Sequence, residues 1–506
     1  MDNEKIFGKK TAKWGWLGGF KGDKIVLMVL LLMMMVSLIA ISGSTPLLAL
    51  QNKTSRMSII GKHAVVTVVG MVLILVLYKF PTSKWFERLS MLGFPVSLTL
   101  LVLLIFHVKW GNVIRAEHIN GAYRSLKVLG QQIHVFEISK VAMVMYLAWA
   151  TKAYKEGTFI LSKKIAAITR INKSGEEKHP LAFVDTKLGQ VVFYMMIPLL
   201  SVSVLILYGG FSSAVFITGV MIATVLFGGV EFKYVILTGV VAGGLAAGAF
   251  ALHVATDGDA FPRFSTVTSR TEKAPSFEEL METRKEKGRN SKEYKEMLQK
   301  LQQPYSARIA VHESGTRPKG IGGSTGKYVV PVMYGDYMFD YIIEETGIAG
   351  AIFIIILYLS LMARGSMIVR NCSDSYDQTV VAGLILLIVG QAFFHMFINL
   401  GIGPLSGQTL PMISHGTSSY LCFSIAFGVI LSISKNAHEK TAEQEREADI
   451  EHGRSVEETV STSTASFGGY NSTAEGSSAE EVENKGESNT GSPYTTSSSS
   501  SNTRYY

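Results

Sequence analysis

Long apolar runs restrict the fold of this chain more than any other feature of its sequence. The first of them, Ile25–Ile41, carries no charged residue. A run of about 18 or more apolar residues is long enough to cross the hydrocarbon core of a membrane as a helix. We therefore predict an all-α polytopic membrane protein with ten transmembrane helices, at residues 25–43, 63–78, 91–108, 136–151, 190–208, 211–229, 234–253, 341–363, 379–398 and 417–434.

The Lys and Arg residues of the short loops predict the orientation, because such residues are concentrated on the cytoplasmic side. If the N-terminus is inside, the inside segments hold twenty of them and the short outside loops seven. Both termini are then cytoplasmic. The predicted parts are a cytoplasmic N-terminal segment (1–24), a membrane domain (25–434) that includes a large extracytoplasmic loop (254–335), and a cytoplasmic tail (435–506).

The formal net charge of +8 combines an acidic tail with a basic body. From Lys435 onward there are six basic and thirteen acidic residues, and Ser, Thr, Glu and Gly are abundant. Such a composition cannot bury enough apolar surface to fold, so we expect a disordered tail, either a linker or a docking segment. The basic body suits membrane lipids with anionic head groups or an anionic lipid substrate. A nucleic-acid partner is not expected, because the basic residues flank the spans.

The cysteines indicate neither a disulfide nor a zinc site. There are two, Cys372 in a predicted cytoplasmic loop and Cys422 within the last predicted span, so we expect both to be free thiols. The sequence has no Cys/His spacing typical of a structural zinc site.

An acidic stretch, GDYMFDYIIEETG, opens the eighth predicted span. A helix would place Asp336, Asp340 and Glu344 along one face, with Glu345 beside them. Burying a charge in lipid costs roughly 2.5 kcal/mol or more, so ionisable groups at the membrane edge indicate a functional site. The alternative is that they complement the helix dipole, worth about 0.3–1 kcal/mol, which explains Asp336 better than Glu344.

The predicted outer loop has a helical part and a glycine-rich part. Ser276 followed by Glu279 is a capping-box pattern that predicts a helix to about Lys300. The following GTRPKGIGGSTGKYVVP (315–331) is either a flexible connector or a segment whose backbone amides can approach an anionic group.

Two further patterns lie within the predicted spans. In the seventh, the glycines 239, 243, 244 and 248 have the spacing that lets membrane helices pack closely, so we interpret them as packing residues. In the fourth, Glu137 and Lys140 lie one turn apart, where they can pair with each other or with Arg124. Structural pairing and the binding of a pyrophosphate are both consistent with this cluster.

Several motifs resemble those of the SEDS family of bacterial cell-wall glycosyltransferases, which includes FtsW, RodA and SpoVE. The family has Pro-x-Ile-Ser-Tyr-Gly-Gly-Ser-Ser before the tenth span, and residues 411–419 read PMISHGTSS. The ninth span and its loop, QAFFHMFINLGIGPLSGQTLP, are similar too, as are NGAYRSL (120–126) and FEISK (136–140). The resemblance extends from about residue 22 to residue 436, and the GDK and FPRFSTVTSR segments are closest to the FtsW branch of Bacteroidetes type.

The resemblance distinguishes between the acidic residues. Asp336 matches the essential aspartate of the family, Glu344 and Glu345 match its paired glutamates, and Asp340 stands at a position that is usually alanine. Upstream, QPYSARIAVHESG (303–315) is similar to the family element Gln-x-x-x-Ala-x-x-Ala, which aligns Gln303. The chain departs from the family at His415, where the motif has tyrosine, at Thr417, and at YGGFSSA, which lacks the usual proline and aspartate.

The resemblance implies polymerisation of lipid II at the outer face of the inner membrane by a peptidoglycan glycosyltransferase. Asp336 would be the catalytic carboxylate, acting alone or as a ligand of Mg²⁺ or Mn²⁺, with no organic cofactor and with Glu344 and Glu345 in support. Residues expected to bind lipid II or its pyrophosphate are Arg124, Glu137, Lys140, Arg263, Gln303, Ser414 and Ser418.

The expected partners are a class B penicillin-binding protein and other division proteins, and the expected location is the division septum. Three alternatives remain at this point. The chain could flip lipid II across the membrane, it could be a non-catalytic division scaffold, or it could serve elongation as RodA does. Against a transporter, the sequence has no obvious internal repeat, and its acidic cluster lies at the membrane edge.

Overall fold

The structure is a computed structural model. It describes residues 20–80, 83–110, 114–119, 122–128, 131–166, 170–171, 177–178, 182–256, 277–288, 291–294, 297–298, 318–328, 330, 332–400 and 407–440. The predicted site residues Arg263 and Gln303 lie outside these residues, as do the tail beyond residue 440 and most of the N-terminal segment. All of the described residues belong to the first of two compact units, Met1–Glu443.

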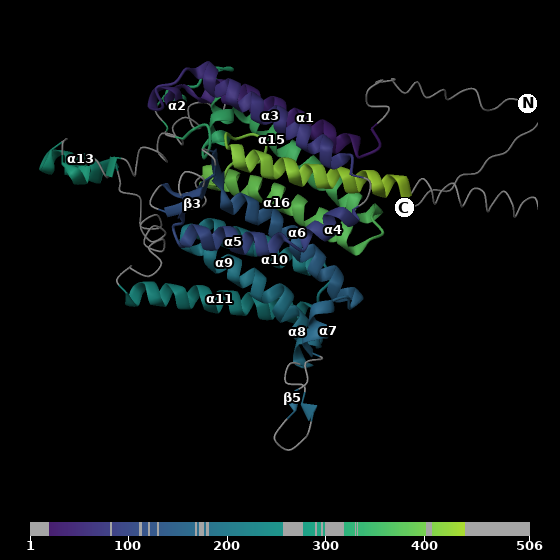
Figure 1. The fold of residues 1–506 in the computed structure, drawn as a ribbon. Coiled ribbons are helices and arrows are strands. Elements are labelled where there is room, and N and C mark those ends of the chain that lie inside the picture. The colour runs from purple at the N-terminus through teal and green to yellow at the C-terminus, as the bar shows by residue number, and fades with distance from the viewer. Residues whose placement is uncertain are drawn as a thin grey trace, which may run out of the picture. The chain divides into compact units, whose positions relative to one another are not determined.

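The described residues are mostly helical (Figure 1). Among them, eight helices are long and apolar enough to cross a membrane: α1 (Lys24–Ser44), α3 (Arg56–Tyr78), α4 with α5 (Lys84–Ile105), α8 to α9 (Lys187–Gly209), α11 (Phe232–Ala255), α15 (Met338–Asn371), α16 (Ser375–Asn399) and the helix Thr417–Lys440. Helix α10 (Phe211–Phe227) is apolar but shorter. Helix α6 (Val135–Glu156) is long enough but carries five charged residues. Helices α6 and α10 correspond to the two remaining predicted spans, 136–151 and 211–229.

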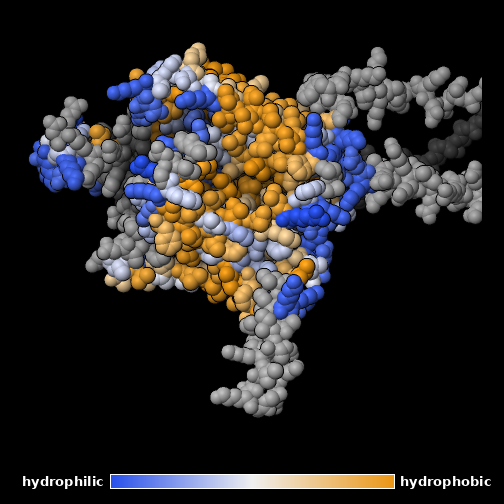
Figure 2. Space-filling view, in the orientation of Figure 1, coloured by the Kyte–Doolittle hydropathy of each residue, from blue (hydrophilic) through white to orange (hydrophobic). Residues whose placement is uncertain are grey.

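The surface supports a membrane environment. Figure 2 shows a broad hydrophobic band on one face, with hydrophilic residues gathered at its two ends. Such an exposed apolar area is typical of a surface that contacts lipid or another protein. Together with the eight apolar helices, it confirms the prediction of a multi-pass helical membrane protein.

The core lies around α16 and the helix Thr417–Lys440. Of their apolar windows, 67% and 83% of the residues are buried, against 11% for α11. Helix α16 packs against α15, α6 and α10, so it brings together segments that are far apart in sequence. Polar side chains on α16 can therefore meet residues from several elements.

The interpretation of the α11 glycines as packing residues stays a prediction, because no described neighbour packs on them. A Cβ atom added at any of the four would meet no heavy atom of the described residues within 4 Å. The helix packs against α10, and its buried residues are Val235, Thr238 and His253. The glycines therefore lie on a part of α11 that the described residues leave open.

A four-stranded antiparallel sheet between α5 and α6 was not predicted. Its strands run in sequence order, β1 (Lys109–Trp110), β2 (Ile114–Ile119), β3 (Ala122–Val128) and β4 (Gln131–His134). Glu117 pairs with Ser125 in register, and an irregularity follows between Glu117 and His118. The Asn-Gly at 120–121, between two strand-length runs, is the sequence signal that could have predicted this hairpin.

The shorter elements complete the described structure. They are α2 (Pro46–Gln51), α7 (Ile160–Ala166), β5 (Arg170–Ile171), β6 (Glu177–Lys178), η1 (Ala182–Asp185), the π-helical η2 (Val192–Met196), α13 (Phe277–Lys287) and η3 (Gly326–Tyr328). Helix α13 is shorter than the helix predicted to reach Lys300. It ends at Lys287 because Gly288 adopts φ 80°, a left-handed conformation that commonly terminates helices.

Candidate active site

A tight turn holds Asp336 immediately before α15. The carbonyl oxygen of Val332 accepts hydrogen bonds from the amides of Gly335 (2.9 Å) and Asp336 (3.0 Å). Val332 has φ 58°, which is unusual for a β-branched residue. Asn399, the last residue of α16, donates from Nδ2 to the carbonyl oxygen of Asp336 at 3.0 Å. Backbone contacts from two directions thus fix the position of this residue.

Gly407 lies close to both Asp336 and Arg124. A Cβ atom added at Gly407 would be 3.6 Å from Asp336 Oδ2 and 3.9 Å from Arg124 Nη1. Gly407 itself has φ 64°, which favours glycine. Arg124 is held on its other side, where Nε donates to the Gly209 carbonyl oxygen at 3.0 Å. The structure therefore brings a carboxylate from the start of α15 close to a guanidinium from β3.

Lys140 lies at the centre of a buried polar cluster beside this pair. Its side chain is 1% exposed, and Nζ donates to Glu137 Oε1 (2.8 Å), Gln391 Oε1 (2.8 Å) and Gln408 Oε1 (2.7 Å). An ammonium has three donors, and these three oxygens engage all of them. Gln408 in turn donates to Ser213 Oγ at 2.6 Å. This geometry favours the structural pairing of Lys140 with Glu137, and a substrate-binding role for either residue stays a prediction.

The cluster also fixes the segment that contains Gly407. Gln391 donates to the Thr409 carbonyl oxygen at 3.0 Å, and His395 Nδ1 lies 2.7 Å from the Gln408 carbonyl oxygen. Gln391, His395 and Asn399 recur every four residues, so they lie on one face of α16. Sequence reasoning missed Gln408, Ser213 and the Gly209 carbonyl, because the four-residue spacing of polar residues is a signal only for the side chains on α16 itself.

The two predicted motif serines, Ser414 and Ser418, link separate segments through hydrogen bonds. Ser414 Oγ accepts from the Leu410 amide and donates to the Gly335 carbonyl oxygen, both at 2.9 Å, so it ties the motif to the Asp336 turn. Ser418 Oγ accepts from the His134 amide and donates to the Gln132 carbonyl oxygen, both at 3.1 Å. Ser418 therefore occupies the hydrogen-bonding edge of β4, as a neighbouring strand would.

His415 packs against the Asp336 turn from the same motif. Its amide donates to the Tyr334 carbonyl oxygen at 2.9 Å, and the two rings meet edge to face with centroids 5.5 Å apart. Burial lowers the pKa of His415, while burial and the Asp336 charge raise the pKa of Tyr334. Both side chains are therefore neutral at pH 7 and support the turn without adding charge.

Glu344 and Glu345 bind the glycine-rich segment. The fully buried carboxylate of Glu344 accepts from Lys319 Nζ (2.8 Å), from Ser324 Oγ, and from the amides of Thr325 (2.8 Å) and Gly326 (3.1 Å). Glu345 Oε1 accepts from the Gly322 amide at 2.8 Å. The segment does bring its amides to anionic groups, and these groups are the chain's own carboxylates.

The eighth predicted span is interrupted. Gly347, within α15, has φ 68° and ψ −164°, a conformation open essentially to glycine, so the helix is broken there. Asp340, Glu344 and Glu345 precede the break, and the long apolar part follows it. The prediction of one continuous span over 341–363 was wrong in this respect. Asp340 is fully buried and has no assigned role.

The described residues do not form a cage for a divalent cation. Among them there is no group of three or more His, Cys, Asp or Glu side chains that could hold a metal ion. Near Gly407 the donor set is the Asp336 carboxylate, and the neighbouring Arg124 is a cation. Mg²⁺ is commonly bound by one or two carboxylates together with substrate phosphates. The residues present therefore do not fit a resident ion held by the protein alone.

These features define a multi-pass helical membrane protein with a buried polar cluster and a carboxylate–guanidinium pair at one end of its helices. A family model described as "Cell cycle protein", FTSW_RODA_SPOVE, matches residues 23–439. The chain belongs to this family, which confirms the resemblance to SEDS proteins; the Bacteroidetes type stays a prediction.

Several known proteins are similar to this chain. The probable peptidoglycan glycosyltransferase FtsW of Methylomonas methanica is 24% identical over 82% of this chain and 92% of its own length. Peptidoglycan glycosyltransferase MrdB of Escherichia coli is 29% identical over 25% of this chain and 35% of its own. Among solved structures, the rod shape determining protein RodA of Thermus thermophilus has a TM-score of 0.48 and 16% identity, over 84% of this chain and 99% of its own.

Proposed function

We propose that this protein is a peptidoglycan glycosyltransferase that polymerises lipid II into glycan strands, with Asp336 as the catalytic carboxylate. Membership of the family and the names of the similar proteins support the activity. The observation that carries the site is that Asp336 and Arg124 both lie within 4 Å of the position that a Cβ atom at Gly407 would occupy. A carboxylate that can act as a base and a nearby guanidinium suit a reaction in which a hydroxyl attacks and a pyrophosphate leaves.

The proposed reaction has one proton transfer and one displacement. The Asp336 carboxylate takes the proton of the acceptor's sugar hydroxyl as that oxygen attacks the anomeric carbon of the donor. The bond between this carbon and the carrier's phosphate oxygen breaks, and undecaprenyl pyrophosphate leaves with the electron pair. The Arg124 guanidinium donates hydrogen bonds to the pyrophosphate as charge develops there. Because Gly407 has no side chain, it places no Cβ atom within 4 Å of these two groups.

In this proposal, a divalent cation would bind only together with the substrate. Bound to lipid II phosphates and Asp336, Mg²⁺ or Mn²⁺ would neutralise charge on the leaving group. Within this chain, Asp336 is the residue that would contact it. Lys140, which is paired with Glu137, donates to Gln408 and thereby helps to position the adjacent Gly407.

The proposed topology has ten spans, with both termini in the cytoplasm and residues 254–335 outside. The excess of basic residues in the inside segments supports it. The Asp336 turn, the glycine-rich segment and the sheet would then lie at the outer face of the bacterial inner membrane, where lipid II is polymerised. We propose the division septum as the site of action, because a similar protein that covers 82% of this chain is named FtsW.

A class B penicillin-binding protein is the proposed partner. Its single span would pack on the apolar face of α15 beyond Gly347, where Ile348, Ile352 and Ile356 recur every four residues and are each more than half exposed. Phe397 of α16 is 52% exposed. These residues offer a membrane helix an apolar stripe.

Reconstitution of the purified chain, with its partner and lipid II, tests the proposed function. We expect glycan strands to appear on a polyacrylamide gel and lipid II to be consumed. Translocation of lipid II without strands would favour the flippase. If neither occurs while the chain still recruits its partner, the scaffold is favoured. A tagged copy along the side wall instead of the septum would favour an elongation role.

A further inference from the structure

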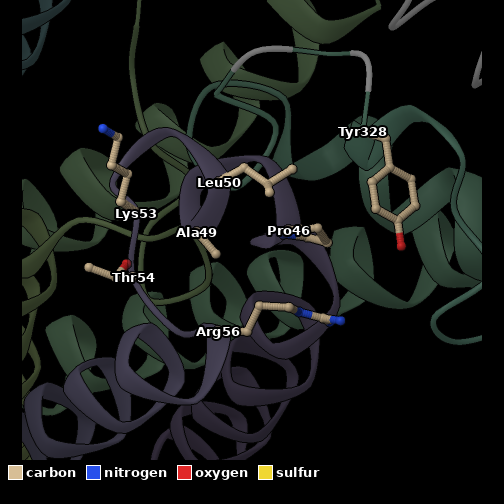
Figure 3. A pocket seen from close by; sticks show the side chains of 7 residues that line it. All are labelled: Pro46, Ala49, Leu50, Lys53, Thr54, Arg56 and Tyr328. Atoms are coloured by element: carbon tan, nitrogen blue, oxygen red, sulfur yellow. The ribbon is translucent and has the colours of Figure 1, made fainter.

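A pocket of about 590 Å³ lies beside α2, on the segment that joins α1 to α3. It is lined by Pro46, Ala49, Leu50, Lys53, Thr54, Arg56 and Tyr328 (Figure 3). This volume is within the range of about 300–1,000 Å³ typical of small-molecule sites. The proposed catalytic mechanism uses none of these residues.

One wall of the pocket is apolar and belongs to α2. Pro46, Ala49 and Leu50 form it, and Leu50 is 72% exposed. The wall lies between the end of the apolar helix α1 at Ser44 and the start of the apolar helix α3 at Arg56. Both helices are candidate membrane spans, so the pocket lies at the boundary between the hydrocarbon core and the head groups.

The remaining lining residues are basic or carry a hydroxyl group. They are Lys53, Arg56, Thr54 and Tyr328. Arg56 Nη2 donates to the Ser42 carbonyl oxygen at 3.0 Å, which anchors the guanidinium at the pocket. In Figure 3, the Arg56 guanidinium and the Tyr328 hydroxyl extend on the same side of Pro46, and the Lys53 amine extends away from them. None of the seven lining residues is acidic. The arrangement is complementary to an anion with an apolar attachment.

We propose that this pocket binds an anionic glycerophospholipid. Its phosphate would contact Arg56 and Tyr328, and its glycerol and first acyl carbons would lie on Pro46, Ala49 and Leu50. A basic pocket at the membrane surface selects anionic head groups by charge. The same phosphate chemistry occurs in soluble phosphate esters, but these would leave the apolar wall unused. The inference depends on the proposed topology only for the leaflet that supplies the lipid.

Native mass spectrometry of the purified full-length chain tests the proposal. The probes are dioleoyl phosphatidylglycerol, dioleoyl phosphatidylcholine and glycerol phosphate, each titrated separately. We expect phosphatidylglycerol to bind roughly tenfold more tightly than phosphatidylcholine, because both lipids carry the phosphodiester but phosphatidylcholine also carries a choline cation, which the basic lining repels. Arg56→Gln should remove this preference, whereas Tyr328→Phe, which loses a neutral donor to the phosphate common to both lipids, should weaken the binding of both lipids and keep the preference. Arg115→Gln, a control at an exposed position of β2, should leave it unchanged.

Three results would overturn the inference. They are equal binding of the two lipids by the parent chain, an unchanged preference in Arg56→Gln, and binding of glycerol phosphate as tight as that of phosphatidylglycerol. The last result would assign the pocket to a soluble anion. Lipid II polymerisation is assayed on the same samples. A failure of the lipid site with normal strand formation is therefore distinct from a failure of the proposed function.

Discussion

Gly407 is the residue at which the proposed site can be blocked with the smallest change. In Gly407→Ala, a methyl group would lie within 4 Å of both Asp336 and Arg124. We expect strand formation to fall at least about tenfold, because the added group occupies space that the reacting atoms need. The left-handed backbone costs a further ~1–2 kcal/mol in the stability of the variant.

Gly157 provides the matched control for this backbone cost. It ends α6 with φ 63°, nearly the value of Gly407, and a Cβ atom there meets nothing within 4 Å among the described residues. Gly157→Ala should lose a similar amount of thermal stability and keep its activity. Equal activities of the two variants would show that the space at Gly407 is not used by substrate.

At the scale of elements, Glu344 is the main attachment of the glycine-rich segment to α15. Glu344→Gln keeps the size of the side chain but removes the charge that Lys319 and two amides contact. Breaking a buried ion pair costs about 3–5 kcal/mol, so we expect lower stability and faster hydrogen exchange at residues 325 and 326. Glu439→Gln, at an exposed ion pair with Lys21, should change little. Unchanged exchange at these amides would contradict the proposed attachment.

The loop between α15 and α16 should make stability depend on pH. Burial raises the pKa of Asp374, but hydrogen bonds from Lys152 and from backbone amides outweigh it and hold this pKa below its ordinary value. A lowered pKa means that the charged form stabilises the fold. This contribution is present above the unfolded pKa of about 3.9 and is lost as pH falls through the folded value.

Thermal unfolding of the parent and of Asp374→Asn, measured between neutral and strongly acidic pH, checks this contribution. The difference in melting temperature between the two proteins should be largest near neutral pH and should shrink toward the acid end. A difference that stays constant across the range would show that the Asp374 charge contributes nothing.

At the scale of the whole molecule, introduced cysteines can test the topology, because the two native cysteines should not react. Cys372 and Cys422 are both buried, and burial raises the pKa of the Cys372 thiol to about 12, so neither should react readily. In spheroplasts, Glu117→Cys should react with a membrane-impermeant maleimide, and Glu439→Cys should react only after permeabilisation. The reverse pattern would place the Asp336 turn on the cytoplasmic side.

The sequence was most informative where the signal is local. Apolar runs predicted the spans because a membrane helix is recognised from its own residues, and the motifs predicted the proximity of Asp336 and Arg124 through the family resemblance. The sheet was missed because its strands are short and partly polar. The acids of GDYMFDYIIEETG looked equivalent because the sequence does not show that α15 begins after Asp336, at Met338, or that the glycine-rich segment binds Glu344.

Residues brought together from distant segments were the least predictable. The partners of Lys140 come from α6, α16 and the segment after it, and no local pattern joins them. The α11 glycines had the spacing of a packed interface, but spacing alone does not say whether a neighbour is present. Glu344 and Glu345 were predicted to support the site. Both hold the glycine-rich segment against α15, and Glu344→Gln tests this role.

The most direct test of the account compares lipid II binding and strand formation in Asp336→Asn and the parent. The variant keeps the shape of the side chain and the backbone bonds of the turn, but its amide cannot take a proton. We predict that it binds lipid II like the parent and forms strands at least about 100-fold more slowly, the usual range for loss of a general base. Glu117→Gln is the matched control. Strand formation by Asp336→Asn at the parental rate would contradict the central claim.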